Sequence, residues 1–221
     1  MNDQTSAPHR PSLFYCPGAC SLASQIALEE AGVAHDLGFV NLTGDRTDYY
    51  RVNPSGKVPA LLLDGELLTE NIAILTWAAR QSPDRALLPV EDLALARAYS
   101  FMAWCASTAH IARRQFRAPQ RFTPDASAHP ALQAAGREAF WAVLRQIDER
   151  IGAGDWVLGA DFSVCDGYAM VFYDWGVRDE HPVDSLRSYS RFAERMTQRP
   201  AVRKALETHR SPLVMSRAVG F

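Results

Sequence analysis

The chain has 221 residues, of which 48% are hydrophobic and 22% charged, and its formal net charge is −2. This composition is that of a globular protein and excludes a disordered chain, while the near-neutral charge argues against nucleic acid as a partner, because nucleic-acid binders usually carry a basic excess. No apolar run approaches the roughly 18 residues of a membrane-spanning helix, so no membrane partner is expected.

The first eleven residues are polar and contain Pro8 and Pro11. They lack the apolar core of a secretory signal, so residues 1–11 are interpreted as a flexible tail and the protein as cytoplasmic. The four cysteines are then in a reducing compartment and are too few for a disulfide scaffold. Their spacing matches no paired metal-ligand pattern, and no metal site is predicted.

The first third of the chain alternates strands and helices. Residues 12–15 are a short apolar strand that stops at Pro17-Gly18. Residues 21–31 carry apolar side chains at helical spacing, and Gly32 closes this helix as a C-cap. Residues 35–42 suit a second strand, and the polar segment 43–51 suits one or two helical turns.

Two apolar runs, 58–63 and 66–68, are separated by Asp64-Gly65, which predicts a β-hairpin because both turn residues tolerate positive φ. A helix is predicted over residues 69–80. The resulting order is β-α-β-α-β-β-α. Its strand-helix-strand start implies a parallel pair, and the hairpin adds antiparallel strands.

The rest of the chain shows no convincing strand. Helical patterns cover residues 92–115, 130–152, 163–176, 185–199 and 200–210. The predicted fold class is therefore an α/β domain joined to an all-α domain. The expected boundaries are 12–82 for the α/β domain, 83–91 for the linker and 92–221 for the helical domain.

Cys20 lies where the first helix begins, and there the helix dipole and free N–H groups favour an anion. A cysteine at this position is expected to have a lowered pKa and a reactive thiolate; alternatively it is a small buried side chain. Cys16, four residues earlier, either forms a disulfide or redox pair with Cys20 or merely packs beside the first turn.

Several polar residues allow both a structural and a functional reading. A cis bond at Val58-Pro59 would turn the backbone N–H and C=O of Val58 outward to a peptide-like ligand. Glu70 and Asn71 can cap the helix that follows or present polar groups to a ligand carboxylate. Ser163 and Asp166 have the form of a capping box and are assigned a folding role.

His110 is either a satisfied polar residue of its helix or a catalytic group. The arginines that follow recur at near-helical spacing. They form either a solvated basic face or a surface that attracts anionic ligands into a cleft. These residues are Arg113, Arg114, Arg117 and Arg121.

Together these motifs resemble the bacterial glutathione transferases, most closely the beta class. Residues 13–22 (LFYCPGACSL) are similar to the opening motif of that class, with Cys20 on its signature cysteine. Residues 53–61 (NPSGKVPAL) are similar to the segment that leads into the family's cis-proline. The resemblance covers about residues 12 to 200 and includes Glu70, His110 and the capping motif at Ser163 and Asp166.

The resemblance implies a thioredoxin-like N-terminal domain, glutathione as co-substrate without a prosthetic group, and a homodimer. It implies Cys20 and His110 as catalytic residues, with Cys16 as a possible redox partner. Trp104, Phe116 and Phe122 are the expected walls of the second-substrate pocket. The glutathione-binding residues implied are Arg46, Lys57, Val58, Pro59, Glu70 and Asn71.

Three departures from the family pattern concern this site. Asn71 stands where serine is frequent, and Cys16 where serine or threonine is usual. The segment 44–51 is shorter than in typical beta-class chains, and Arg46 takes the place of a family lysine.

The function implied is conjugation of the glutathione thiolate to small hydrophobic electrophiles, with thiol-transferase or peroxidase activity through Cys20 as an additional possibility. One alternative is glutathione-dependent cleavage or dehalogenation of an aromatic compound. Another is a non-catalytic binding or regulatory protein on the same scaffold, because a fold does not fix a function.

Overall fold

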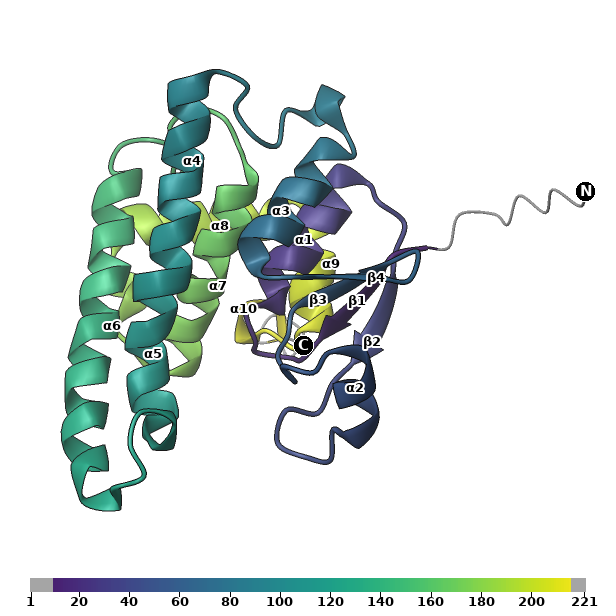
Figure 1. The fold of residues 1–221 in the computed structure, drawn as a ribbon. Helices are drawn as coiled ribbons and strands as arrows, with labels where there is room; N and C mark the ends of the chain where they lie inside the picture. Colours follow the sequence, from purple (N-terminus) through teal and green to yellow (C-terminus); the bar gives the residue numbers. More distant parts are fainter. Residues whose placement is uncertain (1–9, 216–221) are drawn as a thin grey trace, which may run out of the picture.

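A computed structural model of the protein describes residues 10–215. Most of the predicted tail, residues 1–9, and the last residues of the predicted helical domain, 216–221, lie outside the described residues. The chain forms a part that contains the sheet and an all-helical part, which lie side by side (Figure 1). This arrangement confirms the predicted fold class.

The sheet has the strand order β2-β1-β3-β4. β1 pairs in parallel with β2, while the β1–β3 and β3–β4 pairs are antiparallel, as the sequence predicts. At the hairpin turn, Asp64 and Gly65 both have positive φ, 46° and 90°. The second strand is shorter than predicted because, among the described residues, it pairs only with β1, which supplies four residues of ladder. The strands are β1 (Ser12–Tyr15), β2 (Asp36–Phe39), β3 (Ala60–Leu63) and β4 (Glu66–Thr69).

The helices of the sheet-containing part are α1 (Ser21–Ala31), α2 (Thr47–Val52) and α3 (Asn71–Arg80). Within α1 only Glu29 is not buried, because α1 packs against α3 on one side and against helices of the other part, α7 and α9, on the other. A helix that is buried all round is part of the core. Gly32 ends α1 with φ 69°, as predicted.

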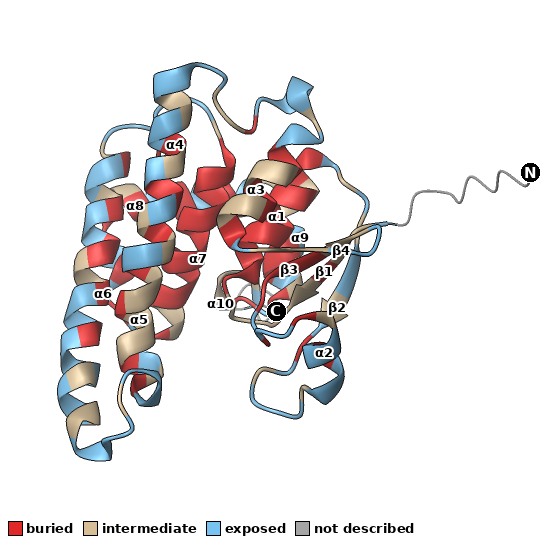
Figure 2. Cartoon of the chain, in the orientation of Figure 1, coloured by how far each residue is buried: buried red, intermediate tan, exposed pale blue. Residues whose placement is uncertain are grey.

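The helix α7 is buried from Val164 to Gly176, since it lies between α1 and the other helices of the helical part (Figure 2). The predicted capping box at its start is present, since the carboxylate of Asp166 accepts from the backbone N–H of Ser163 at 2.8 Å. None of the described helices is long and apolar enough to cross a membrane. The helices are α4 (Asp92–Trp104), α5 (His110–Arg117), α6 (His129–Ile151), α7 (Val164–Arg178), α8 (Arg187–Gln198), α9 (Pro200–Thr208) and α10 (Pro212–Met215).

The helical pattern predicted over residues 92–115 is confirmed, but the helix is not regular throughout. A π turn, Cys105–Ala109, separates α4 from α5. A π turn accommodates an extra residue within a helix and is frequent at functional sites. Its alanine-rich sequence has the same periodicity as the helix around it, so the interruption leaves no local signal. The short helix α10 was also not predicted.

Candidate functional site

Two cavities open between the loop before α1 and the facing helix α5. Their volumes are about 420 and 240 Å3. The larger extends toward Arg46 and Tyr50 and the smaller toward Glu70 and Tyr168. They are the two arms of one cleft, because both are lined by Cys20, Ser55, Lys57, Val58, His110 and Arg114.

Cys20 occupies the N-cap position of α1 at the junction of the two arms and is 7% exposed. Its Sγ donates to the carbonyl oxygen of Val58 at 3.6 Å. The amide of Asn71 donates to the carbonyl oxygen of Cys20 at 3.2 Å, and Ser24 Oγ donates to Asn71 Oδ1 at 2.7 Å. The side chain of Asn71 is therefore used to fix the cysteine's backbone.

The prediction of a lowered Cys20 pKa is wrong. Burial raises the pKa of the Cys20 thiol to about 11, and the positive charge of Arg114 offsets only part of this effect. The start of a helix favours a thiolate, but removing the sulfur from water disfavours the charged form more strongly. Cys20 is accordingly a neutral thiol at physiological pH.

Cys16 is half-buried at the end of β1 and is a free thiol, as is Cys20, so the structure contains no disulfide between them. The backbone N–H of Cys16 donates to Ser21 Oγ at 3.3 Å. The other two cysteines, Cys105 and Cys165, are buried and free. The described residues contain no group of histidine, cysteine and acidic side chains that could hold a metal ion.

The bond Val58-Pro59 is cis. Among residues 10–215, no group accepts a hydrogen bond from the Val58 N–H, which borders both arms of the cleft. Glu70 has φ 69° and ψ 129°, a backbone conformation that L residues rarely adopt. Its exposed side chain lines the smaller arm, so the unusual conformation lies at the cleft.

His110 is the first residue of α5 and its ring contacts that of Trp175 at 5.1 Å. Burial and nearby cations, Arg114 first among them, lower the pKa of His110 to about 3, so the imidazole is neutral. Its Nε2 lies 3.3 Å from a guanidinium nitrogen of Arg114. Because arginine only donates hydrogen bonds, Nε2 is the acceptor and we assign the ring proton to Nδ1.

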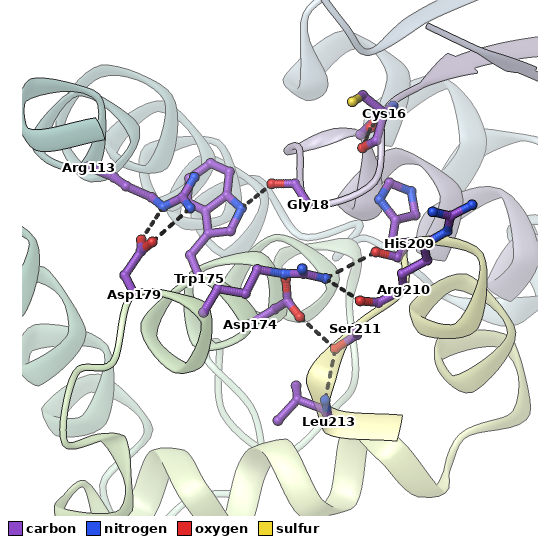
Figure 3. Close-up of polar contacts among 12 residues, drawn as sticks. Cys16, Gly18, Arg113, Asp174, Trp175, Asp179, His209, Arg210, Ser211 and Leu213 are labelled. Carbon is purple, nitrogen blue, oxygen red and sulfur yellow. Dashed lines mark hydrogen bonds and ion pairs between the residues drawn. The ribbon is translucent and has the colours of Figure 1, made fainter. Parts of the chain in front are cut away.

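Trp175 lies on α7, within the helical pattern predicted over residues 163–176, which assigns it no role at the site, but it links the two parts of the chain there. Its Nε1 donates to the carbonyl oxygen of Gly18 at 2.8 Å (Figure 3). The guanidinium of Arg113 lies 4.3 Å from the Trp175 ring and is held by both carboxylate oxygens of Asp179. No local pattern could reveal this role, which depends on contacts between distant segments.

The aromatic residues predicted as second-substrate walls line neither arm of the cleft. Trp104 packs on Phe101, Phe116 is buried beside Phe140, and Phe122 is 41% exposed. The larger arm is lined instead by the predicted basic residues, which favours the interpretation that they face a cleft. Those residues are Arg113, Arg114, Arg117 and Arg121.

Comparison with known proteins gives concordant matches. The family model described as the N-terminal domain of glutathione S-transferase matches residues 18–81. Glutathione S-transferase GstA of Escherichia coli O157:H7 is 36% identical over 200 residues, which cover 88% of this chain and 96% of that protein.

Solved structures agree with the sequence matches. A glutathione transferase homologue from Sulfitobacter with bound glutathione has a TM-score of 0.84 and 31% identity, covering 90% of this chain and 97% of that one. A bacterial beta-class glutathione S-transferase of Sphingomonas chungbukensis has a TM-score of 0.78 and 38% identity, covering 90% of this chain and 98% of that one.

Proposed function

The chain belongs to the glutathione S-transferase family and is an enzyme that uses glutathione as a substrate, and on that premise we propose that glutathione lies in the two-armed cleft with its sulfur beside Cys20. The observation that carries this placement is that both arms share Cys20, Val58, His110 and Arg114. The proposed reaction is attack of the glutathione thiolate on an electrophilic carbon.

Glutathione is a peptide-like molecule with one ammonium and two carboxylate groups. We propose that the free Val58 N–H pairs with its cysteinyl backbone, with Pro59 shaping that wall. The γ-glutamyl end would enter the smaller arm, where Glu70 attracts its ammonium and Asn71 lies at the start of α3. The glycyl carboxylate would meet the cations on the sheet side of the larger arm, Arg46 and Lys57.

The chemistry proposed is stabilisation of the glutathione thiolate. The neutral Cys20 thiol, the Nδ1–H of His110 and the charge of Arg114 all favour a negative sulfur. Each unit by which the sulfur's pKa falls corresponds to about 1.36 kcal/mol of preferential thiolate binding. The thiol proton leaves to solvent, a carbon–sulfur bond forms, and the leaving group departs with its bonding electron pair.

A nucleophilic role for Cys20 is disfavoured by its pKa of about 11. Thiol–disulfide exchange needs the thiolate, which at pH 7 is about one part in ten thousand of a thiol with that pKa. We therefore propose conjugation as the main activity and Cys20 as a hydrogen-bond donor to the bound sulfur, its single S–H turning there from the carbonyl oxygen of Val58. Thiol transfer through Cys20, with Cys16 as its redox partner, is the competing hypothesis.

Replacing Cys20 separates these hypotheses. In Cys20→Ala, kcat/KM for conjugation of a chloronitrobenzene is expected to fall roughly tenfold or more, since a donor to the thiolate is lost. In Cys20→Ser, which keeps a donor, most of this activity should be retained. Strong thiol transfer to a mixed disulfide in the unmodified enzyme, abolished in both variants, would show that Cys20 is the nucleophile and contradict the proposal.

Replacing Glu70 with glycine should make the fold more stable and weaken the binding of glutathione. Glycine adopts positive φ without steric cost, so Glu70→Gly is expected to raise the free energy of unfolding by about 1 kcal/mol. It should also weaken glutathione binding several-fold, because the carboxylate that attracts the ammonium is lost. Glu70→Gln is the matched control, which should weaken binding without stabilising the fold. Urea unfolding and calorimetric titration measure the two effects; tight binding by both variants would exclude Glu70 from the site.

We also propose that the protein is cytoplasmic and forms a homodimer. The free cysteines suit a reducing compartment, which supports a cytoplasmic protein. Membership of the family supports a homodimer. We further propose that the domain boundaries are those expected from the sequence, with residues 12–82 as the glutathione-binding domain and residues 92–221 as the helical domain.

A further inference from the structure

We propose that the electrophile joined to glutathione by this enzyme is itself an anion, a small molecule that carries a carboxylate or sulfonate group. This inference rests on the placement of glutathione proposed above. It concerns the larger arm of the cleft, beyond Cys20, where the second substrate must lie to meet the sulfur. It replaces the small hydrophobic electrophile expected from the sequence.

Six cations line the larger arm, and none of the described residues that line it is an aspartate or glutamate. The chain as a whole has a net charge of −2, so this accumulation is local and is not a consequence of a basic composition. A concave site lined by one sign of charge concentrates ligands of the opposite sign. The cations are Arg46, Lys57, Arg113, Arg114, Arg117 and Arg121.

Only part of this charge is compensated by the protein. Asp179 pairs with Arg113 through both oxygens and with Arg117 at 3.6 Å. Within residues 10–215, no carboxylate oxygen lies within 4.0 Å of the other cations of the arm, which are Arg46, Lys57, Arg114 and Arg121. Arg46 also has a buried Nε without a hydrogen-bond partner in this part of the chain.

Glutathione accounts for some of these unpaired cations but not for all. Its glycyl carboxylate is proposed to meet Arg46 and Lys57 on the sheet side, and its γ-glutamyl end lies in the other arm. Arg114 on α5 and Arg121 in the 3-10 turn Pro119–Arg121 belong to the opposite, helical wall. Arg114 borders both arms and its charge is assigned above to the glutathione sulfur, so Arg121 is the cation left facing the second-substrate space without a counter-charge.

A neutral apolar substrate fits this wall poorly. It would remove water from guanidinium groups without replacing the lost hydrogen bonds, which is costly. The larger apolar side chains of the lining are few, since they are Leu42, Tyr50, Val58 and Trp175, and Trp175 is 2% exposed. A carboxylate or sulfonate instead supplies the acceptors that a guanidinium binds best.

The test compares two substrates of matched shape, 4-chloro-3-nitrobenzoate and 4-chloro-3-nitrobenzamide. In each, the glutathione sulfur bonds to the ring carbon, the carbon–chlorine bond breaks, chloride leaves with the bonding pair and the thiol proton passes to the buffer. Each kcat/KM is divided by the uncatalysed rate constant with glutathione. The benzoate is expected to be preferred roughly tenfold at low ionic strength, and less so as salt screens the charges.

Arg121→Gln is expected to lower the benzoate-to-benzamide ratio roughly three- to tenfold, because Arg121 is a partly solvated contact. The matched control is Arg145→Gln, an exposed arginine of α6 outside the cleft and without an ion pair among residues 10–215. It should leave the ratio unchanged. A ratio of one or less in the unmodified enzyme, or an equal ratio in Arg121→Gln, would overturn the inference.

Calorimetric binding of 3-nitrobenzoate and 3-nitrobenzamide, with S-methylglutathione present, gives a readout that does not need turnover. If the benzoate binds more tightly than the benzamide, and this preference is weakened in Arg121→Gln, the inference is supported even when neither chloro compound reacts. The lack of reaction would then count against the conjugation activity proposed above. If both compounds bind equally, the inference is overturned. If 4-chloro-3-nitrobenzamide is nevertheless conjugated normally, the proposed function is unaffected by that result.

Discussion

Replacing Trp175 with alanine is expected to lower the free energy of unfolding by about 3–5 kcal/mol, the cost of emptying a buried aromatic site. The ring is 2% exposed and packs against Phe172 at 5.4 Å and His110 at 5.1 Å. It also supports the guanidinium of Arg113 at 4.3 Å. Removing the ring therefore affects the core and the cleft together, and urea denaturation measures the loss.

The conservative variant Trp175→Phe separates packing from positioning. It keeps most of the ring but removes the N–H that donates to Gly18, two residues before Cys20. We expect a loss of about 1–2 kcal/mol in stability and a several-fold rise in the KM for glutathione, since a shift of the loop misplaces the thiol.

Trp141→Phe is the matched control, because Trp141 stacks on His181 in the helical part, 5.8 Å between ring centres, and lines neither arm of the cleft. It should change stability without changing the KM for glutathione. If Trp175→Phe also left this KM unchanged, the bond from α7 to Gly18 would not position the loop.

A second large effect concerns acid stability and His209. This histidine is fully buried beside the Tyr15 ring, 5.3 Å between ring centres, and neither of its ring nitrogens has a hydrogen-bond partner in the described chain. Burial and the charge of Arg178, whose guanidinium donates to the carbonyl oxygen of His209, lower the pKa of His209 to about 3.

The sign of the pH effect follows from this shift. The unfolded chain takes up a proton at His209 near pH 6.5, whereas the folded protein resists it down to about pH 3. The contribution of neutral His209 to the free energy of unfolding is therefore fully present above pH 6.5. It is lost as the pH falls, by roughly 2–3 kcal/mol at pH 4.5. His110, with a pKa of about 3, adds a loss in the same direction.

His209→Phe is expected to keep the contact with Tyr15 and remove this titration. At pH 7 its stability should be close to that of the unmodified protein or higher, since two unpaired buried nitrogens are removed. Between pH 6.5 and 4.5 its stability should fall less steeply than that of the unmodified protein. Urea denaturation at a series of pH values measures the slope, and an unchanged slope would show that His209 is not a source of acid sensitivity.

Local chemistry explains which parts of the fold could be predicted from the sequence. Asp64-Gly65, Gly32 and the Ser163–Asp166 box each act over a few residues, so their turn, cap and helix start were predicted and are present. The parallel strand pair followed from the strand-helix-strand order. Such signals need no knowledge of distant segments.

The candidate site was predictable only in part, because its properties depend on segments that meet in three dimensions. Cys20 was expected to be a thiolate from its helix position, but its burial raises the thiol's pKa instead. Trp104, Phe116 and Phe122 have the residue types of an apolar wall, yet packing directs them away from the cleft. Charge pairing by Asp179 decides which arginines are free, and it links positions far apart in the chain.

The π turn Cys105–Ala109 has a consequence for how chains of this architecture can diverge. Each residue gained or lost within a helix rotates everything beyond it by about 100° around the axis. Loss of one codon in this turn would leave α5 helical but rotate His110 and Arg114 away from the sulfur position and expose a different set of side chains there. Single-codon insertions and deletions at this turn thus offer evolution a route to a new substrate class without any substitution in the cleft itself.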